Sequence, residues 1–325
     1  MRGRWQVLCG VVATAAVVHA GGSWAQTWPA KPIRYVIPFD AGASPDIVGR
    51  TITERLSRLW GQQVVVENRV GAAGTLGSAY VAKAPPDGYT LLQANIASNA
   101  IAVSLYAKMP YDQLRDFAPI TRIGMTPNVI LVHPSVPFRT VRQMVDYAKA
   151  HPGKLNYSAS LPGTSPHLTM ELLKLQMKFD IVFIPYKLGS QAVTDTIGGQ
   201  VPINVSNGPL SIGALQGKRL RALAVTSAQR IAVLPDVPTM KESGVPDFEV
   251  NSWYGLMAPA GTPTAILDKI NADMHTALRA PEVEKRMQDV AMPPSPTTRQ
   301  EFDQFVRAEV ARWGRVIKEA GIPQQ

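Results

Sequence analysis

Two short stretches share one pattern, GASPDI at residues 42–47 and GTSPHL at residues 163–168. Both read Gly, any residue, Ser, Pro, Asp or His, and an aliphatic residue. The first stretch follows the strand-like run IRYVIPF, the second follows KLNYSAS, and each precedes a helix-like run. Strand, tight turn and helix are therefore expected twice, about one domain apart. This repeat predicts an α/β chain built from two similar halves.

The rest of the chain extends this repeat into alternating strands and helices. A helix is expected over residues 45–60, with Val48, Ile52, Leu56 and Leu59 on one face. The alternation favours a mostly parallel sheet, with a break near residues 128–134. The second half is complete before the chain ends. The late strand SWYGLMAP (252–259) and two amphipathic helices, at 263–278 and 299–320, are therefore expected to return to the first half. Two crossings would form a two-stranded hinge.

The first 25 residues have the layout of a secretory signal peptide. Arg2 and Arg4 precede an apolar run at residues 7–20, and cleavage is expected after Ala25. A retained anchor is the alternative, although 14 apolar residues fall short of the roughly 20 that span a bilayer. The only cysteine, Cys9, lies in this segment, so no disulfides are expected in the mature chain. These features predict export to the periplasm.

The composition of the chain limits the classes of molecule that it is expected to bind. About 300 mature residues suggest two domains, and removing Arg2 and Arg4 lowers the formal net charge from +9 to +7. The basic residues form no run and do not alternate with aromatic residues, so nucleic acid is not expected as a partner. A dispersed positive charge suits a protein that collects anions from dilute solution.

No pattern of residues indicates catalysis. There is no Gly-x-Ser-x-Gly elbow, and Ser165 and His167 are too close on a helix start to form a nucleophile–base pair. GAAGTLG (71–77) is only loosely similar to a dinucleotide-binding turn. The five histidines form no His-x-x-x-His pair. We therefore expect a binding protein without cofactor or metal. An exported enzyme on a two-lobed scaffold is the alternative.

The repeated turns are suited to anions. Gly42 allows a tight turn, Ser44 is a good helix N-cap, and Pro45 fits the first helical position. GTSPHL has glycine, serine and proline at the same three positions. Helix N-termini bind anions, and ligands of open α/β sheets lie beyond the carboxyl ends of the strands. If each half brings one turn to a shared cleft, a small carboxylate or dicarboxylate fits between them. Asp46 and His167 are either ligand contacts or, respectively, a charge favouring the helix dipole and a surface residue.

Ordered blocks throughout the mature chain resemble one family, the tripartite tricarboxylate transporter receptors, which are Bug-type periplasmic solute-binding proteins. The blocks are WPAKPIRYVIPFDAG, VVVENRVGAAGTLG, APPDGYTLL, MPYDQLRDFAPIT, HPGKLNYSAS, GTSPHL, LRALAVTS, LPDVPTMKESGVPDFE and SWYGLMAPAGTP. The resemblance implies two Rossmann-like lobes around a central ligand cleft, as in type II periplasmic binding proteins. We expect residues 26–128 and 252–325 in lobe 1 and residues 129–251 in lobe 2.

The resemblance also implies function and site residues. It implies a monomeric receptor, not an enzyme, that delivers a carboxylate to the small and large subunits of a membrane transporter. Delivery to a sensory receptor is the alternative. The loops at residues 39–46 and 163–167 would bind the ligand. The expected ligand-binding residues are Phe39, Asp40, Ala41, Gly42, Ala43, Ser44, Asp46, Asn95, Ser158, Ser160, Gly163, Thr164, Ser165, His167, Tyr186 and Asn207.

Several residues depart from the family pattern. Asp40 adds a negative charge beside the expected anion site, and Ala43 stands where glycine is common. Leu161 and Pro162 replace small or polar residues, and Ser206 replaces a frequent aspartate. The fold tolerates these changes, but they leave ligand identity open between a small polar acid and an apolar or aromatic one.

Overall fold

A computed structural model of the protein describes residues 28–319 and 321–324. The expected signal peptide and Cys9 lie outside these residues. The strands are β1 (Ile33–Ile37), β2 (Val64–Asn68), β3 (Thr90–Asn95), β4 (Phe117–Val132), β5 (Asn156–Ala159), β6 (Val182–Pro185), β7 (Ile203–Asn207), β8 (Arg221–Val225) and β9 (Asn251–Pro259). The helices are α1 (Ser44–Trp60), α2 (Thr75–Ala82), α3 (Ala102–Leu105), α4 (Val141–Ala150), α5 (Ser165–Met177), α6 (Gly189–Ile197), α7 (Gly208–Gln216), α8 (Thr264–Leu278), α9 (Pro281–Asp289) and α10 (Arg299–Glu319). The short helices η1 (Ala72–Gly74) and η2 (Ala97–Ile101) precede α2 and α3.

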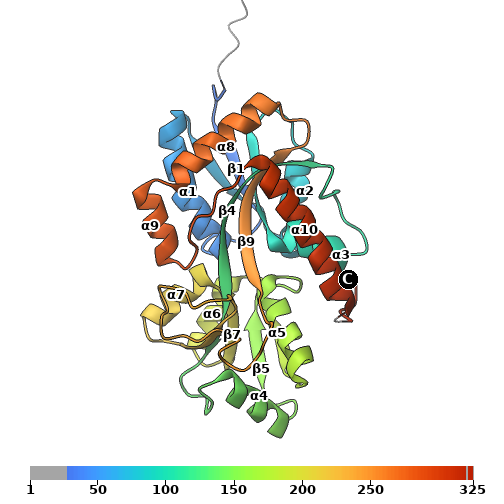
Figure 1. Ribbon diagram of the computed structural model, residues 1–325, viewed down its shortest axis with the longest axis vertical. Helices are drawn as coiled ribbons and strands as arrows, with labels where there is room; N and C mark the ends of the chain where they lie inside the picture. The colour runs from blue at the N-terminus through green and yellow to red at the C-terminus, as the bar shows by residue number, and fades with distance from the viewer. Residues whose placement is uncertain (1–27, 320, 325) are drawn as a thin grey trace, which may run out of the picture.

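The sheet has one parallel group in each lobe. In the upper lobe of Figure 1, β1 pairs in parallel with β2 and β3; in the lower lobe, β5 pairs in parallel with β6 and β7. The strands β4 and β9 run between the two groups and are antiparallel to their neighbours. The expectation of a mostly parallel sheet is therefore wrong, because the connecting strands pair in the opposite direction.

The long strand β4 joins the lobes without a break. Up to Pro127 it pairs with β9, and from Asn128 it pairs with β7 and β8. At the expected break between the halves, residues 128–134, the strand continues to Val132 but exchanges one set of backbone partners for another at Asn128. The lobe boundaries at residues 128/129 and 251/252 remain a proposal.

The late elements return to the upper lobe, as the sequence predicts. Strand β9 pairs with β3, α8 contacts α1, and α10 contacts β4 and α3 (Figure 1). Most of the predicted face of α1 is buried: Val48, Ile52 and Leu56 are at most 1% exposed and belong to the upper core. The prediction is wrong for Leu59, which is 38% exposed near the end of the helix. Helix α9 was not predicted.

This topology places the two repeated turns at comparable ends of the parallel groups. The turn at residues 42–47 links β1 to α1, and the turn at residues 163–168 links β5 to α5. Because each turn follows the carboxyl end of a parallel strand, both lie where α/β proteins place ligand sites. In the part of the chain that the structure describes, no helix combines the length and apolarity needed to cross a membrane.

Candidate ligand-binding cleft

A cleft lies between the lobes, with about 550 Å³ of empty space when its opening to solvent is counted. Its lining consists of Phe39, Asp40, Ala43, Ser44, Pro45, Asn95, Ile96, Ala97, Ser160, Thr164, Ser165, Pro166, Gly189, Asn204, Val205, Ser206, Asn207, Leu210, Ser252 and Tyr254. Asp40 is the one charged side chain of this lining. Among residues 28–319 and 321–324, no group of acidic, His or Cys side chains could hold a metal ion.

The structure brings part of the predicted site together. The predicted residues that line the cleft are Phe39, Asp40, Ala43, Ser44, Asn95, Ser160, Thr164, Ser165 and Asn207. The predicted residues outside the lining are Ala41, Gly42, Asp46, Ser158, Gly163, His167 and Tyr186. Their contribution to binding remains a prediction, and any such contribution would act through the shape of the cleft.

The two turns have the same geometry. Gly42 and Gly163 both have φ of +80°, a conformation that glycine adopts without strain. The N–H of Gly42 donates to Asp46 Oδ2 at 2.9 Å, and the N–H of Gly163 donates to His167 Nδ1 at 3.3 Å. Asp46 and His167 thus hold their own turns closed. This shared task explains why the repeat has an acceptor side chain four residues after each glycine.

Burial affects these two acceptors differently. Burial raises the pKa of Asp46, but hydrogen bonds from Arg50, Gly42 and Asn68 outweigh it and hold this pKa below its usual value. Burial lowers the pKa of His167. A neutral imidazole has one acceptor nitrogen, as the bond from Gly163 requires. The His167 ring packs on Phe183, with ring centroids 4.5 Å apart.

The expectation that Ser44 and Ser165 cap their helices is wrong. The N-cap residues are Ala43 and Thr164, and neither makes a side-chain capping bond. Each serine is instead the first residue inside its helix, because the glycine turn has already brought the chain into the helical direction. Both hydroxyls therefore remain available for contacts in the cleft.

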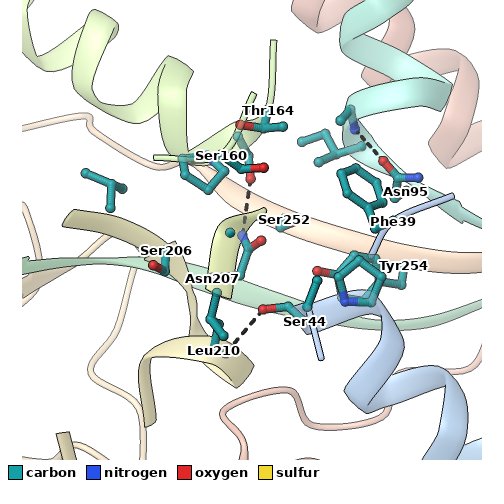
Figure 2. A pocket seen from close by; sticks show the side chains of 18 of the residues that line it. Phe39, Ser44, Asn95, Ser160, Thr164, Ser206, Asn207, Leu210, Ser252 and Tyr254 are labelled. Carbon is teal, nitrogen blue, oxygen red and sulfur yellow. Dashed lines mark hydrogen bonds between the residues drawn. The ribbon is translucent and has the colours of Figure 1, made fainter. Parts of the chain in front are cut away.

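The two serines connect parts of the cleft that are distant in sequence. Ser44 Oγ accepts from the backbone N–H of Leu210, at the start of α7, at 3.2 Å (Figure 2). Ser165 Oγ donates to Asn128 Oδ1 at 3.3 Å, and Asn207 Nδ2 donates to the same oxygen at 2.6 Å. The first bond crosses from α1 to α7, so the lobes touch. The others join α5, β7 and β4.

The cleft offers hydrogen-bond donors from both lobes. The first N–H groups of a helix have no acceptor within that helix, and they lie at the positive end of its dipole. Among the residues that line the cleft, these include the N–H group of Ser44 in α1 and that of Ser165 in α5. This set of neutral donors can bind a carboxylate without a lysine or arginine.

Three predicted residues have structural partners. Asn95 Oδ1 accepts from the N–H groups of Ala97 and Ser98 and so holds the start of η2. Ser158 is fully buried and accepts from Asn204 Nδ2 at 2.9 Å. The hydroxyl of Tyr186 donates to Asp195 at 2.8 Å. Asn95 reaches the cleft nonetheless, whereas Ser158 and Tyr186 support its walls.

Sequence reasoning missed several lining residues. Ser252 and Tyr254 come from β9, which was considered only as a crossing strand, and Asn204 and Leu210 come from β7 and α7. Alternation along a strand could have found Ser252 and Tyr254, since residues two apart share one face. Asn204 and Ser206 form a similar polar pair two residues apart in β7.

A comparison with family models matches residues 48–322 to the tripartite tricarboxylate transporter family receptor. The chain belongs to this family. It is 35% identical over 311 residues to protein BugT of Bordetella pertussis, covering 95% of each chain. The family consists of periplasmic solute-binding receptors, not of enzymes, which confirms both the resemblance and the two-lobed fold class.

Solved structures agree with this assignment. R. palustris Rpa4515 with adipate is 35% identical with a TM-score of 0.89, covering 92% of this chain and 100% of that one. Periplasmic binding protein BugD is 32% identical with a TM-score of 0.87 and the same two coverages. MatC from Rhodopseudomonas palustris with bound malate is 31% identical with a TM-score of 0.84, covering 89% and 100%.

Proposed function

We propose that this protein is a periplasmic receptor that captures a small organic carboxylate or dicarboxylate in the interlobe cleft. It then delivers this ligand to the small and large membrane subunits of a tripartite tricarboxylate-type transporter. The observation that carries the proposal is the meeting of two helix N-termini, of α1 and α5, at one cleft. Each end places a serine in the lining. The relatives with adipate and malate support the ligand class.

The chemistry of the lining supports capture rather than reaction. Ser44 lies beside the backbone N–H of Leu210 and the hydroxyl of Tyr254, and Ser165 lies beside the side-chain amides of Asn128 and Asn207. Neither serine has a base that would make it a nucleophile. Backbone and amide donors bind an anion reversibly, as a carrier requires. The export of this chain is part of the proposal, supported by the sequence of its first 25 residues.

Calorimetry with a panel of C3–C6 mono- and dicarboxylates tests the proposal. We expect saturable binding of one ligand per chain without turnover. On binding we expect the Ser165 hydroxyl to donate to the carboxylate in place of Asn128 Oδ1. Ser165→Ala should therefore weaken this binding by about 10–100-fold, the value of a hydrogen bond to a charged group. Ser227→Ala, a hydroxyl outside the cleft lining, is the matched control and should bind as the wild type does. Absence of binding across the panel, or formation of a product, contradicts the proposal.

Delivery to a transporter needs a separate test. Reconstituted small and large membrane subunits should take up a carboxylate that binds this receptor, and uptake should depend on adding the receptor. A receptor that binds the acid but supports no uptake would favour the sensory alternative.

A further inference from the structure

Asp40 is an unusual residue to find in the lining of a cleft that binds anions. Asp40 is 6% exposed, and its Oδ2 atom is buried without a hydrogen-bond partner among the described residues. None of the ion pairs among the described residues includes Asp40. A buried carboxylate oxygen is normally hydrogen-bonded, because removing it from water is unfavourable.

The turn itself does not require this carboxylate. In the first turn the N–H of Ala43 donates to the backbone oxygen of Asp40 at 3.2 Å; in the second, the N–H of Thr164 donates to the backbone oxygen of Leu161 at 3.3 Å. Leu161 therefore occupies the position of Asp40 in the same fold. Since an apolar side chain is compatible with this turn, the carboxylate of Asp40 needs another explanation.

The position of Asp40 provides that explanation. The same lining contains Ser44 and Ser165, the first residues of α1 and α5. The N–H groups at these two helix starts can donate hydrogen bonds to a carboxylate. Asp40 supplies the opposite property, a buried acceptor with a negative charge. A ligand that satisfies both has a carboxylate and, separately, a group that donates a hydrogen bond.

We propose that Asp40 selects acids that carry a donor group, an ammonium or a hydroxyl, which bonds to its free Oδ2 atom. The proposal rests on the carboxylate-binding function given above and specifies its ligand class. An ammonium satisfies the site better than a hydroxyl, because it also compensates the charge. A plain acid leaves the Asp40 oxygen without a partner and brings a second negative charge close to it.

Matched pairs of acids test this selectivity in the wild-type protein. The pairs are succinate with aspartate or malate, and adipate with 2-aminoadipate, each measured by calorimetry at neutral pH. The donor-bearing acid of at least one pair should bind at least about tenfold more tightly than its plain counterpart, the effect of one hydrogen bond to a charged group.

Two variants assign the preference to Asp40. Asp40→Asn should reduce the ratio between the paired affinities to within about threefold, because the charge-assisted bond is lost. Asp40→Leu, which copies the second turn, should do the same and gives an independent variant if Asp40→Asn fails to fold. Asp236→Asn, an exposed carboxylate outside the lining, removes the same charge and should leave the ratio unchanged.

The outcomes separate this proposal from the one on which it rests. If plain acids bind as tightly as their donor-bearing partners in the wild type, the role of Asp40 is refuted and carboxylate binding stands. The same conclusion follows if the ratio persists in both Asp40 variants. If no acid of either kind binds, the carboxylate-binding function itself fails.

Discussion

Replacing Asp46 by asparagine tests whether the repeated turns hold the ligand directly or only shape the cleft. Asp46 is 3% exposed. Its Oδ2 accepts from the N–H of Gly42 at 2.9 Å and from Arg50 Nε at 2.8 Å, and its Oδ1 accepts from Asn68 Nδ2 at 2.9 Å. Asparagine has a single acceptor oxygen, so in either orientation of its amide at least one of these bonds is lost.

The magnitude follows from which bonds are lost. A hydrogen bond to a charged group contributes about 1.5–3 kcal/mol. The Arg50 side chain is 53% exposed, so its contribution is reduced to about 1 kcal/mol or less by solvent. We therefore expect Asp46→Asn to lower the free energy of unfolding by about 2–3 kcal/mol, dominated by the bond to Gly42 or to Asn68. The melting temperature should fall by about 3–5 °C, given an unfolding entropy of roughly 0.6 kcal/mol/K for about 300 residues.

Urea unfolding and calorimetry on the same variant distinguish the two roles. Because Asp46 does not line the cleft, ligand affinity should change by less than about tenfold, or 1.4 kcal/mol, while stability falls as stated. The pKa of Asp46 is lower in the folded state than its ordinary value of 3.8. Its stabilisation is therefore complete above that value and is lost as the pH falls through the folded pKa. Unchanged stability combined with loss of binding would refute this reasoning.

Three further predictions address the same two turns. Burial lowers the pKa of His167, so wild-type stability should decline as the pH falls below about 6.5, and chemical unfolding of His167→Ala should show a weaker decline over that range. Burial, together with the charge of Asp46, raises the pKa of Asp40 despite an opposing backbone hydrogen bond; Asp40→Asn should therefore raise the melting temperature of the ligand-free protein, and a fall would contradict this. Gly163→Ala should be more destabilising than Gly42→Ala in urea unfolding. Both turns have φ of +80°, but only at Gly163 would the new Cβ meet a neighbour, Leu105 Cδ2 at 2.5 Å. Equal losses of stability would show that the left-handed backbone alone decides the cost.

The sequence was a good guide where local pattern and fold agree. The apolar face of α1 and the returning strand β9 follow from periodicity and from the completeness of the second half. The course of β4 could not be predicted from the sequence, because Pro119 and Pro127 interrupt its pattern of residues. Its partners β9, β7 and β8 also lie far along the chain.

The site was predicted about as far as the repeated motif extends. Ser44 and Ser165 line the cleft, as expected, but as first helical residues and not as caps. That difference depends on how the turn after Gly42 or Gly163 bends, which residue type alone does not determine. Leu210 and Tyr254 could not be found from a motif, because the fold brings them to the cleft from separate elements.

The hydrogen bond between α7 and α1 suggests how binding and closure are coupled at the cleft. The bond from Leu210 N–H to Ser44 Oγ joins α7 to α1, and such a neutral bond contributes only about 0.5–1.5 kcal/mol net. One bond of this size changes the balance between open and closed forms by roughly tenfold at most. A carboxylate that accepts from the first turns of both α1 and α5 contacts both lobes only when they are together. We therefore expect the ligand to bind the closed form more tightly than the open one, and this difference in affinity to drive closure. Because the donors are neutral, opening leaves no buried cation without a partner, and the ligand can be released.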